Sequence, residues 1–150
     1  EEKGEFNIVS KEKFRPALKE LENFTHLNIL WWANQHDNPK SRGITQVSDL
    51  PPFYGEKAPT MGIFATRSEY RPNPILLTTV QILAVDQKKG LIKLAYFDAF
   101  DGSPIIDIKP YLGMTDRVMS AEYPKYLQHW PKTNEEAAEW WAKQFAEMEQ

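Results

Sequence analysis

The chain contains no cysteine among its 150 residues. It therefore has no disulfide, no thiol nucleophile and no thiolate metal site. No apolar run approaches the roughly 18 residues of a membrane-spanning helix, and the first four residues do not resemble a signal peptide. Its three histidines are scattered and show no metal-ligand spacing. These absences predict a cytoplasmic protein that uses neither a membrane nor a metal.

The sequence also lacks an excess of positive charge. Its 18 basic and 21 acidic residues give a formal net charge of −3, whereas a dedicated nucleic-acid binder is usually basic. This balance argues against a large RNA-binding surface, but it permits a local basic patch or one assembled across a dimer. The seven glycines occur singly, so the glycine-rich turn of a dinucleotide-binding fold is missing as well.

The composition of the chain indicates one globular domain over residues 1–150. Hydrophobic residues make up 41% of the chain and charged residues 26%, which is typical of a folded domain of this length. Short apolar segments separated by turns predict a mainly β fold and favour a barrel. The expected strands are residues 6–9, 24–33, 62–65, 75–85, 91–97 and 105–111. Gly90 is expected to supply a left-handed conformation in the hairpin loop 86–90.

Two helices are expected beside the strands. Residues 14–21 predict a short helix with Pro16 in its first turn, where a missing N–H costs nothing. Residues 133–149 predict an amphipathic terminal helix, because Thr133 and Glu136 have capping-box spacing and apolar residues recur at near-helical spacing. That apolar stripe consists of Ala137, Trp140, Trp141, Phe145 and Met148. Residues 34–59 predict a long irregular loop, which in a compact domain is usually functional or mobile.

The most informative stretch is residues 61–75, which read MGIFATRSEYRPNPI. Two prolines around Asn73 exclude helix and restrict φ, so the backbone there is stiff. A rigid loop that carries two guanidinium groups and a carboxamide suits a preformed ligand site. Arg67 and Arg71 can bind a carboxylate bidentately, or one of them can form a surface ion pair with Glu69. Asn73 can contact a ligand, its own backbone, or both.

Two further segments extend this motif. Residues 98–111 read DAFDGSPIIDIKPY and residues 21–32 read LENFTHLNILWW. In their order along the chain, the three segments resemble the TrmO/YaeB-like family, most weakly at 21–32 and over roughly residues 6–117. Members of that family are S-adenosylmethionine-dependent methyltransferases that act on threonylcarbamoyladenosine beside the tRNA anticodon. The resemblance implies an eight-stranded β-barrel that forms a homodimer, with S-adenosyl-L-methionine as cofactor and tRNA as substrate.

The resemblance also implies a cofactor-binding set. It consists of Asn34, Gln35, Arg67, Arg71, Asn73, Pro74, Asp98, Asp101, Gly102, Ser103 and Pro104. Asn34 stands where the family often has histidine, so the correspondence at this strand end rests on Gln35. Methyl transfer from a sulfonium needs alignment and exclusion of water more than titrating groups. Arg67, Arg71 and Asn73 are therefore candidates for positioning, and the catalytic base, if any, stays unassigned. Asp101-Gly102 also fits an ordinary turn.

Other polar and aromatic residues have simpler alternatives. Asp107 lies inside an apolar strand and needs a partner if it points inward; Lys109, Arg67 or Arg71 can provide one. His26 suits either a general base or, more simply, a packed histidine that supports the site. The five tryptophans can stack on bases, although core packing is their ordinary role.

Two further departures from the family pattern affect the expected site and fold. Leu76 stands where glycine usually follows Pro-Asn-Pro-Ile, and its side chain closes the space that a glycine leaves. The strand that usually opens the fold is not found before Phe6, which predicts an unpaired edge that favours dimerisation. A tRNA methyltransferase is the leading hypothesis. The alternatives are a methyltransferase with a small-molecule acceptor, a non-catalytic S-adenosylmethionine-binding module and a plain RNA-binding barrel.

Overall fold

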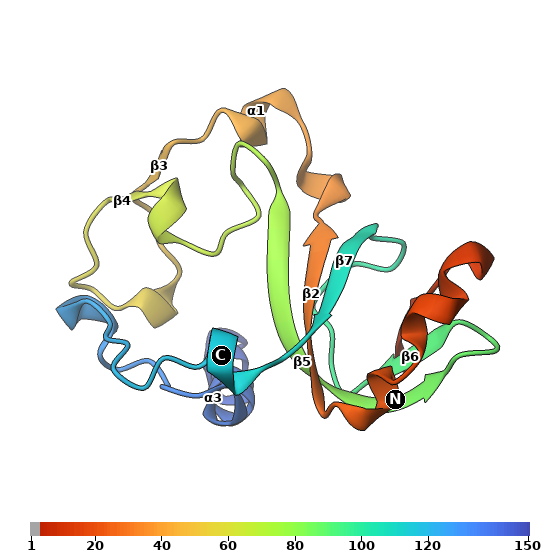
Figure 1. Cartoon of the computed structure of the whole chain (residues 1–150). Coiled ribbons are helices and arrows are strands. Elements are labelled where there is room, and N and C mark those ends of the chain that lie inside the picture. The colour runs from red at the N-terminus through yellow and green to blue at the C-terminus, as the bar shows by residue number, and fades with distance from the viewer. Residues whose placement is uncertain (1–3) are drawn as a thin grey trace.

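The computed structural model describes residues 4–150, and its centre is a five-stranded antiparallel sheet (Figure 1). The strand order is β1-β6-β5-β2-β7. The strands are β1 (Phe6–Val9), β2 (His26–Trp32), β5 (Ile75–Asp86), β6 (Leu91–Leu94) and β7 (Ile105–Pro110). A separate two-stranded ladder pairs β3 (Gln46–Val47) with β4 (Met61–Gly62). The mainly β class predicted from the sequence is confirmed, and the pairing is antiparallel.

Strand β5 joins the two halves of the sheet. Residues 75–81 pair with β2, and residues 82–86 pair with β6. The register shifts between Ile82 and Ala84, and an irregularity of this kind bends a strand. Figure 1 shows β5 running from the loop beside α1 to the hairpin that leads into β6. One strand therefore connects the two ends of the molecule.

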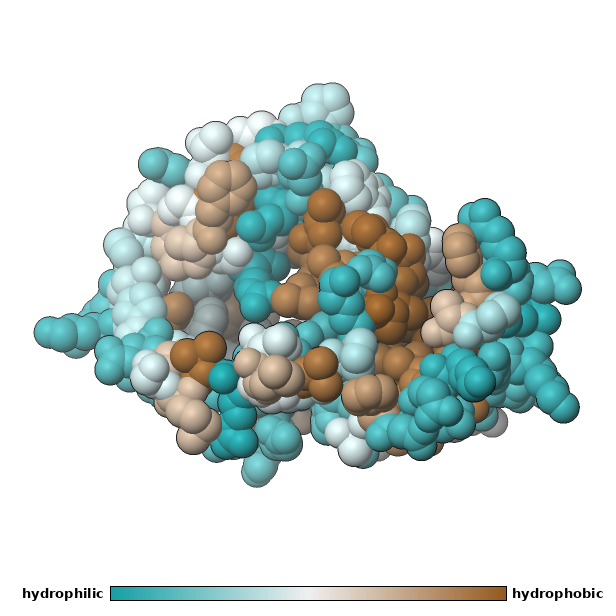
Figure 2. Space-filling view, in the orientation of Figure 1, coloured by the Kyte–Doolittle hydropathy of each residue, from teal (hydrophilic) through white to brown (hydrophobic). Residues whose placement is uncertain are grey.

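The hydrophobic core lies under one face of this sheet. Leu27, Ile29 and Trp31 of β2 are buried and the residues between them are half-buried, as the period of two predicted. The rest of the buried cluster is Ile8, Leu18, Ala33, Val80, Ile92 and Leu94. On the other face, Ile75 and Leu77 of β5 are 42% and 44% exposed. Figure 2 shows hydrophobic residues gathered over the middle of the molecule, where these strands lie.

The sheet does not close within residues 4–150. Strands β1 and β7 are its two outer strands, and no ladder joins them in this part of the chain. The mainly β fold was predicted correctly, but the closed barrel is not confirmed. The described residues form an open, bent sheet.

Several local predictions are wrong in detail. The 3-10 helices Glu12–Leu18 and Leu21–Asn23 replace the predicted helix over 14–21. Pro16 lies inside the first of these helices, where its missing N–H removes a bond that an α-helix needs. Residues Ile63–Ala65 form a 3-10 turn, because their partner strand β3 is only two residues long. Strand β6 ends at Leu94, three residues earlier than expected.

The long segment 34–59 is irregular, as predicted, with only short elements in it. These are the 3-10 turns Asn34–His36 and Pro52–Tyr54, strand β3 and the one-turn helix α1 (Pro39–Arg42). After β7 come α2 (Gly113–Asp116), the 3-10 turn Lys125–Leu127 and α3 (Asn134–Met148). None of the helices in residues 4–150 combines the length and hydrophobicity needed to cross a bilayer.

The terminal helix α3 begins as predicted. The Thr133 side chain accepts a hydrogen bond from the N–H of Glu136 (3.2 Å). The Glu136 carboxylate accepts from the N–H of Lys132 (3.3 Å), one residue before the position that a capping box uses. Trp140 and Trp141 of the apolar stripe contact the ring of Phe53, with centroids 6.2 and 4.9 Å away. The helix is thereby attached to the long loop.

Candidate functional site

Three loops meet at one end of the sheet, because β2 ends where β5 and β7 begin. The N–H of Ala33 donates to the carbonyl of Pro74 (2.9 Å), and the N–H of Trp32 donates to the carbonyl of Pro104 (2.9 Å). Segments 34–42, 67–74 and 98–104 therefore converge although they are far apart in the sequence. Every cofactor-binding candidate predicted from the sequence lies in one of these segments.

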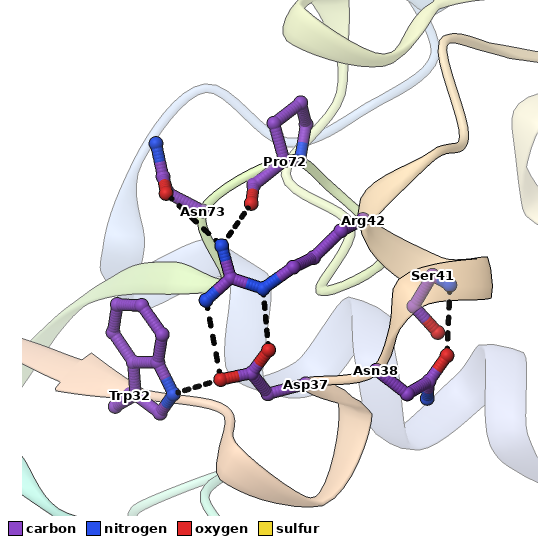
Figure 3. Close-up of polar contacts among 7 residues, drawn as sticks. All are labelled: Trp32, Asp37, Asn38, Ser41, Arg42, Pro72 and Asn73. Atoms are coloured by element: carbon purple, nitrogen blue, oxygen red, sulfur yellow. Dashed lines mark hydrogen bonds and ion pairs between the residues drawn. The ribbon is translucent and has the colours of Figure 1, made fainter.

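Arg42 connects two of the converging loops (Figure 3). Its Nε and Nη2 donate to the two carboxylate oxygens of Asp37, Nη2 at 3.2 Å. Its Nη1 donates to the Pro72 carbonyl at 2.8 Å and to Asn73 Oδ1 at 3.3 Å. The guanidinium also lies 5.4 Å from the ring centroid of Trp32, whose indole N–H donates to Asp37 (3.1 Å). This cluster fixes the proline-asparagine turn against the end of β2.

The charges in this cluster support each other. The hydrogen bond from Arg42 lowers the pKa of Asp37 below its usual value, and the same contact raises the pKa of Arg42. Sequence reasoning missed both residues. The local sequence signal lay between them, because Asn38 followed by Pro39 is a typical helix start. Asn38 does cap α1 by accepting from the N–H of Ser41 (2.9 Å).

Arg71 stabilises the backbone of its own loop. Its Nη1 donates to the carbonyls of Thr66 and Ser68, both at 3.0 Å. The ion pair with Glu69 considered from the sequence is not found for Arg67 or Arg71 among residues 4–150. Glu69 instead lies 3.7 Å from Nε2 of His36.

A pocket of about 470 Å³ opens between this loop and β5. Arg67, Arg71 and Asp98 bring charges of both signs to its lining. The Thr78 hydroxyl donates to Oδ1 of Asp98 (2.9 Å), and the indole N–H of buried Trp31 donates to that hydroxyl (3.0 Å). Asp98 is thus positioned by a relay that starts in the core. The other lining residues are Phe64, Ala65, Thr66, Ile75, Leu76 and Leu77.

The turn before β7 lies beside this pocket. The N–H and the hydroxyl of Ser103 both donate to the Phe100 carbonyl (3.1 and 2.7 Å), and Gly102 has φ +81°. Asp101 is exposed at this turn. His36 stacks on Phe100 with ring centroids 6.0 Å apart, which links the turn to the loop after β2. The candidates at this sheet end that do not line the pocket are Asn34, Gln35, Asn73, Pro74, Asp101, Gly102, Ser103 and Pro104.

Pro74 and Asp107 have structural roles in the described chain. The ring of Pro74 is fully buried, so it is inaccessible to a ligand and anchors the start of β5. Asp107 faces solvent and does not point into the core. It pairs with Lys109 (2.8 Å), one of the partners considered, and accepts from the N–H of Ile108 (2.9 Å). These contacts lower the pKa of Asp107, and the carboxylate raises the pKa of Lys109.

The histidines outside the pocket make packing contacts. Nδ1 of His26 lies 2.8 Å from the Thr25 hydroxyl, and its ring meets Tyr111 edge-on at 6.4 Å. Nε2 of His129 lies 2.8 Å from the carbonyl of Phe53, beside the terminal helix. This arrangement favours the packing role for both residues.

The pocket offers three kinds of recognition. Arg67 presents a guanidinium, which suits a carboxylate. Asp98 presents a carboxylate, which suits a cation or hydroxyl groups. The ring of Phe64 is 79% exposed in the lining, and an open aromatic face suits a planar ring. Together, the guanidinium, the carboxylate and the aromatic ring suit a ligand that combines an amino-acid part with a heterocycle.

Comparison with known proteins identifies relatives of this chain. The family model of the tRNA-methyltransferase O N-terminal domain matches residues 1–117. The tRNA (adenine(37)-N6)-methyltransferase of Escherichia coli (strain K12) is 36% identical over 130 residues, which are 85% of this chain and 53% of that protein. The S-adenosyl-L-methionine-binding protein of Archaeoglobus fulgidus is 37% identical over 115 residues, which are 77% of this chain and 75% of that protein.

A solved structure shares the fold. The crystal structure of TrmO from Pseudomonas aeruginosa superposes with a TM-score of 0.57 and 27% identity, covering 77% of this chain and 45% of that one. The chain thus spans about half the length of that protein and of the Escherichia coli relative. Its three converging loops all lie within residues 1–117. The chain belongs to the tRNA-methyltransferase O N-terminal domain family.

Proposed function

We propose that this chain binds S-adenosyl-L-methionine at the pocket of Arg67, Arg71 and Asp98 and methylates an adenosine of tRNA. The observation that carries the proposal is the convergence of these three charged side chains on one cavity within the family-matched region. More specifically, we propose that the methylated adenosine is threonylcarbamoyladenosine in the anticodon loop. Its threonine carboxylate gives the arginine-rich loop a second anionic group to recognise.

The donor set fits the proposed cofactor. S-adenosyl-L-methionine supplies an activated methyl group on a sulfonium centre when it is bound. Arg67 would bind a carboxylate, and Asp98 would attract the ammonium or accept from ribose hydroxyls. Both groups are needed close together, because the methionine part of the cofactor carries its ammonium and its carboxylate on the same carbon atom. Arg71 would keep the loop in shape, since its Nη1 is bonded to two backbone carbonyls.

The remaining residues would exclude water and orient the acceptor. Phe64, Ile75 and Leu77 form an apolar part of the lining, and methyl transfer benefits from a dry, aligned site. Leu76 also lines the pocket and is half-buried against the core. Its side chain reduces the space that the family's glycine would leave, so the acceptor would approach from the side of the exposed loops.

The test is calorimetric titration of the 150-residue chain with S-adenosyl-L-methionine. Arg67→Ala and Asp98→Asn are each expected to weaken binding by about 1.5–3 kcal/mol, the range for hydrogen bonds to charged groups. Asp107→Asn is the matched control, because this carboxylate is outside the pocket. Incorporation of labelled methyl groups into total tRNA then tests the reaction. Absence of cofactor binding by the folded chain would refute the proposal.

A second function is a cofactor-binding module without transfer. The name of the Archaeoglobus fulgidus relative describes S-adenosyl-L-methionine binding only, and this chain spans half of the Escherichia coli enzyme. Tight cofactor binding without methylation of tRNA would favour this function. Methylation of a small molecule in place of tRNA would favour a third function, that of a methyltransferase with a small-molecule acceptor.

We further propose that the chain acts in the cytoplasm, where tRNA is modified, as a homodimer. The support for the homodimer is the open edge at β7 together with the exposed apolar side chains on the uncovered sheet face. A second copy would cover this face and close the open sheet into a barrel-like assembly. Sedimentation equilibrium tests the dimer, and a strictly monomeric chain at micromolar concentration would contradict it.

A further inference from the structure

A second concave surface lies at the other end of β5, where the hairpin into β6 meets the first 3-10 helix (Figure 1). We call it the hairpin pocket. Its lining consists of Arg15, Pro16, Ala84, Val85, Asp86, Gln87, Lys88, Lys89, Leu91 and Lys93, and its volume is about 960 Å³. Four of these residues are basic and one is acidic. Figure 2 shows mostly hydrophilic residues over this end of the molecule.

Two acidic side chains at this end, Asp86 and Glu5, are already engaged. The Asp86 carboxylate accepts from the backbone N–H of Lys89 (3.1 Å) and so closes the hairpin turn. Glu5 lies 3.8 Å from Nζ of Lys93. Within residues 4–150 no ion pair involves Arg15, Lys88 or Lys89. Within the described chain their charges are therefore not neutralised by an ion pair.

Arg15 is held in this place by packing. Its Cγ and Nε lie 3.0 Å from where a Cβ on Gly90 would be, and the N–H of Ser10 donates to the Gly90 carbonyl (2.7 Å). The Nε atom is buried without a hydrogen-bond partner in the described part of the chain. A guanidinium is thus fixed beside two lysines, and no carboxylate among residues 4–150 forms an ion pair with it.

From this geometry we infer that the hairpin pocket binds phosphates of an RNA backbone. A chain with net charge −3 can attract RNA only where its positive charge is concentrated. The opposite charge gathers on α3, which carries Glu135, Glu136, Glu139 and Glu147. This asymmetry would orient an approaching RNA with its phosphates on the hairpin and away from the terminal helix.

The inference rests on the proposed function only for the identity of the partner, a tRNA. Strand β5 has 12 residues, so the hairpin lies at most about 40 Å from the cofactor pocket at the rise of an extended strand. A folded RNA presents phosphates over such distances, whereas a single nucleotide does not. The hairpin would hold the body of the RNA while the cofactor pocket holds one base.

The experiment measures the affinity of the 150-residue chain for total tRNA over a series of salt concentrations. The Lys88→Gln/Lys89→Gln double variant removes two exposed charges without disturbing the packing. If each lysine neutralises one phosphate, the slope of log K against log salt should fall in magnitude by about 1.4–1.8. A triple variant that adds Arg15→Gln should lower it further. The matched control is Lys57→Gln/Lys125→Gln/Lys143→Gln, which has the same charge change outside the pocket.

The outcomes separate this inference from the proposed function. Equal slopes for the triple variant and the triple control, or no RNA binding by the unaltered chain, overturn the hairpin inference even if S-adenosyl-L-methionine binds. A parallel titration uses ATP as a small anionic probe. If the triple variant loses affinity for ATP while its RNA affinity is unchanged, the inference is also overturned, because the pocket would then bind small anions. A reduced slope in a chain that fails to bind S-adenosyl-L-methionine supports the inference and refutes the cofactor site.

Discussion

Arg42 contacts both carboxylate oxygens of Asp37, through Nε and Nη2 of its guanidinium. The remaining terminal nitrogen, Nη1, donates to the carbonyl of Pro72. The arginine is outside the lining of the cofactor pocket. The loops that form the pocket are therefore positioned by a pair that does not line it.

Replacing Arg42 with lysine should weaken cofactor binding without unfolding the chain. Lysine keeps the charge, but it cannot contact two carboxylate oxygens and a carbonyl with one planar group. We expect S-adenosyl-L-methionine affinity to fall by up to about fivefold, the range for solvent-exposed ion pairs. Calorimetry measures the affinity and a thermal scan measures stability. Arg117→Lys is the control, and equal affinities for the two variants would contradict the positioning role.

The same pair should make stability depend on pH. Arg42 lowers the pKa of Asp37, so near pH 4, the usual aspartate pKa, the unfolded state binds more protons than the folded state. The free energy of unfolding therefore rises with pH in this window. The contribution is complete above about pH 4 and is lost as pH falls through the folded-state pKa.

Thermal unfolding between pH 3 and 7 should detect this contribution. Asp37→Asn should flatten the acid part of the curve. Asp107→Asn serves as a calibration, because Lys109 lowers the pKa of that carboxyl too and the sign is the same. If Asp37→Asn changes stability equally at every pH, the pair is not coupled to folding.

Sequence patterns predicted the strands better than the turns between them. The strand predicted over residues 24–33 is found as β2, in which a period of two places Leu27, Ile29 and Trp31 in the core. Gly90 was also predicted correctly, since its φ is +65°. Segment 62–65 was misassigned, because apolar residues alone do not reveal whether a partner strand continues beside them.

The sequence motifs named residues that the fold brings together, but they did not reveal the residues that hold them in place. The motif around Arg67 and Asp98 named two residues that line the same pocket. Thr78 was missed because a threonine in a strand is ordinary, and only the fold reveals that its hydroxyl joins Trp31 to Asp98. Arg42 was missed for a similar reason, because its partners come from its own loop and from the loop 67–74. Side-chain relays between distant segments leave little local signal.

Thr78 provides a test of the relay. Thr78→Val removes a hydroxyl that accepts from the indole of Trp31 and donates to Asp98. Trp31 is 4% exposed, so its N–H would lose its partner in a buried place, at a cost of about 1–3 kcal/mol. Denaturant unfolding measures this loss, and calorimetry should show weaker cofactor binding. Thr78→Ser keeps the hydroxyl and should restore both, whereas a valine variant as stable as the parent would exclude the relay.

Gly90 provides a test at the opposite end of β5. Its φ of +65° is unfavourable for any residue with a Cβ, by about 1–2 kcal/mol. An added Cβ would also lie 3.0 Å from the Ser10 carbonyl oxygen, and backbone at that position cannot move aside as a flexible side chain can. Gly90→Ala should therefore destabilise the chain by at least the conformational cost. Gly113→Ala is the control, because nothing lies within 4 Å of its Cβ position. Since Arg15 packs on the same glycine, Gly90→Ala should also weaken RNA binding, and a stable variant with full RNA affinity would mean that Gly90 does not fix Arg15.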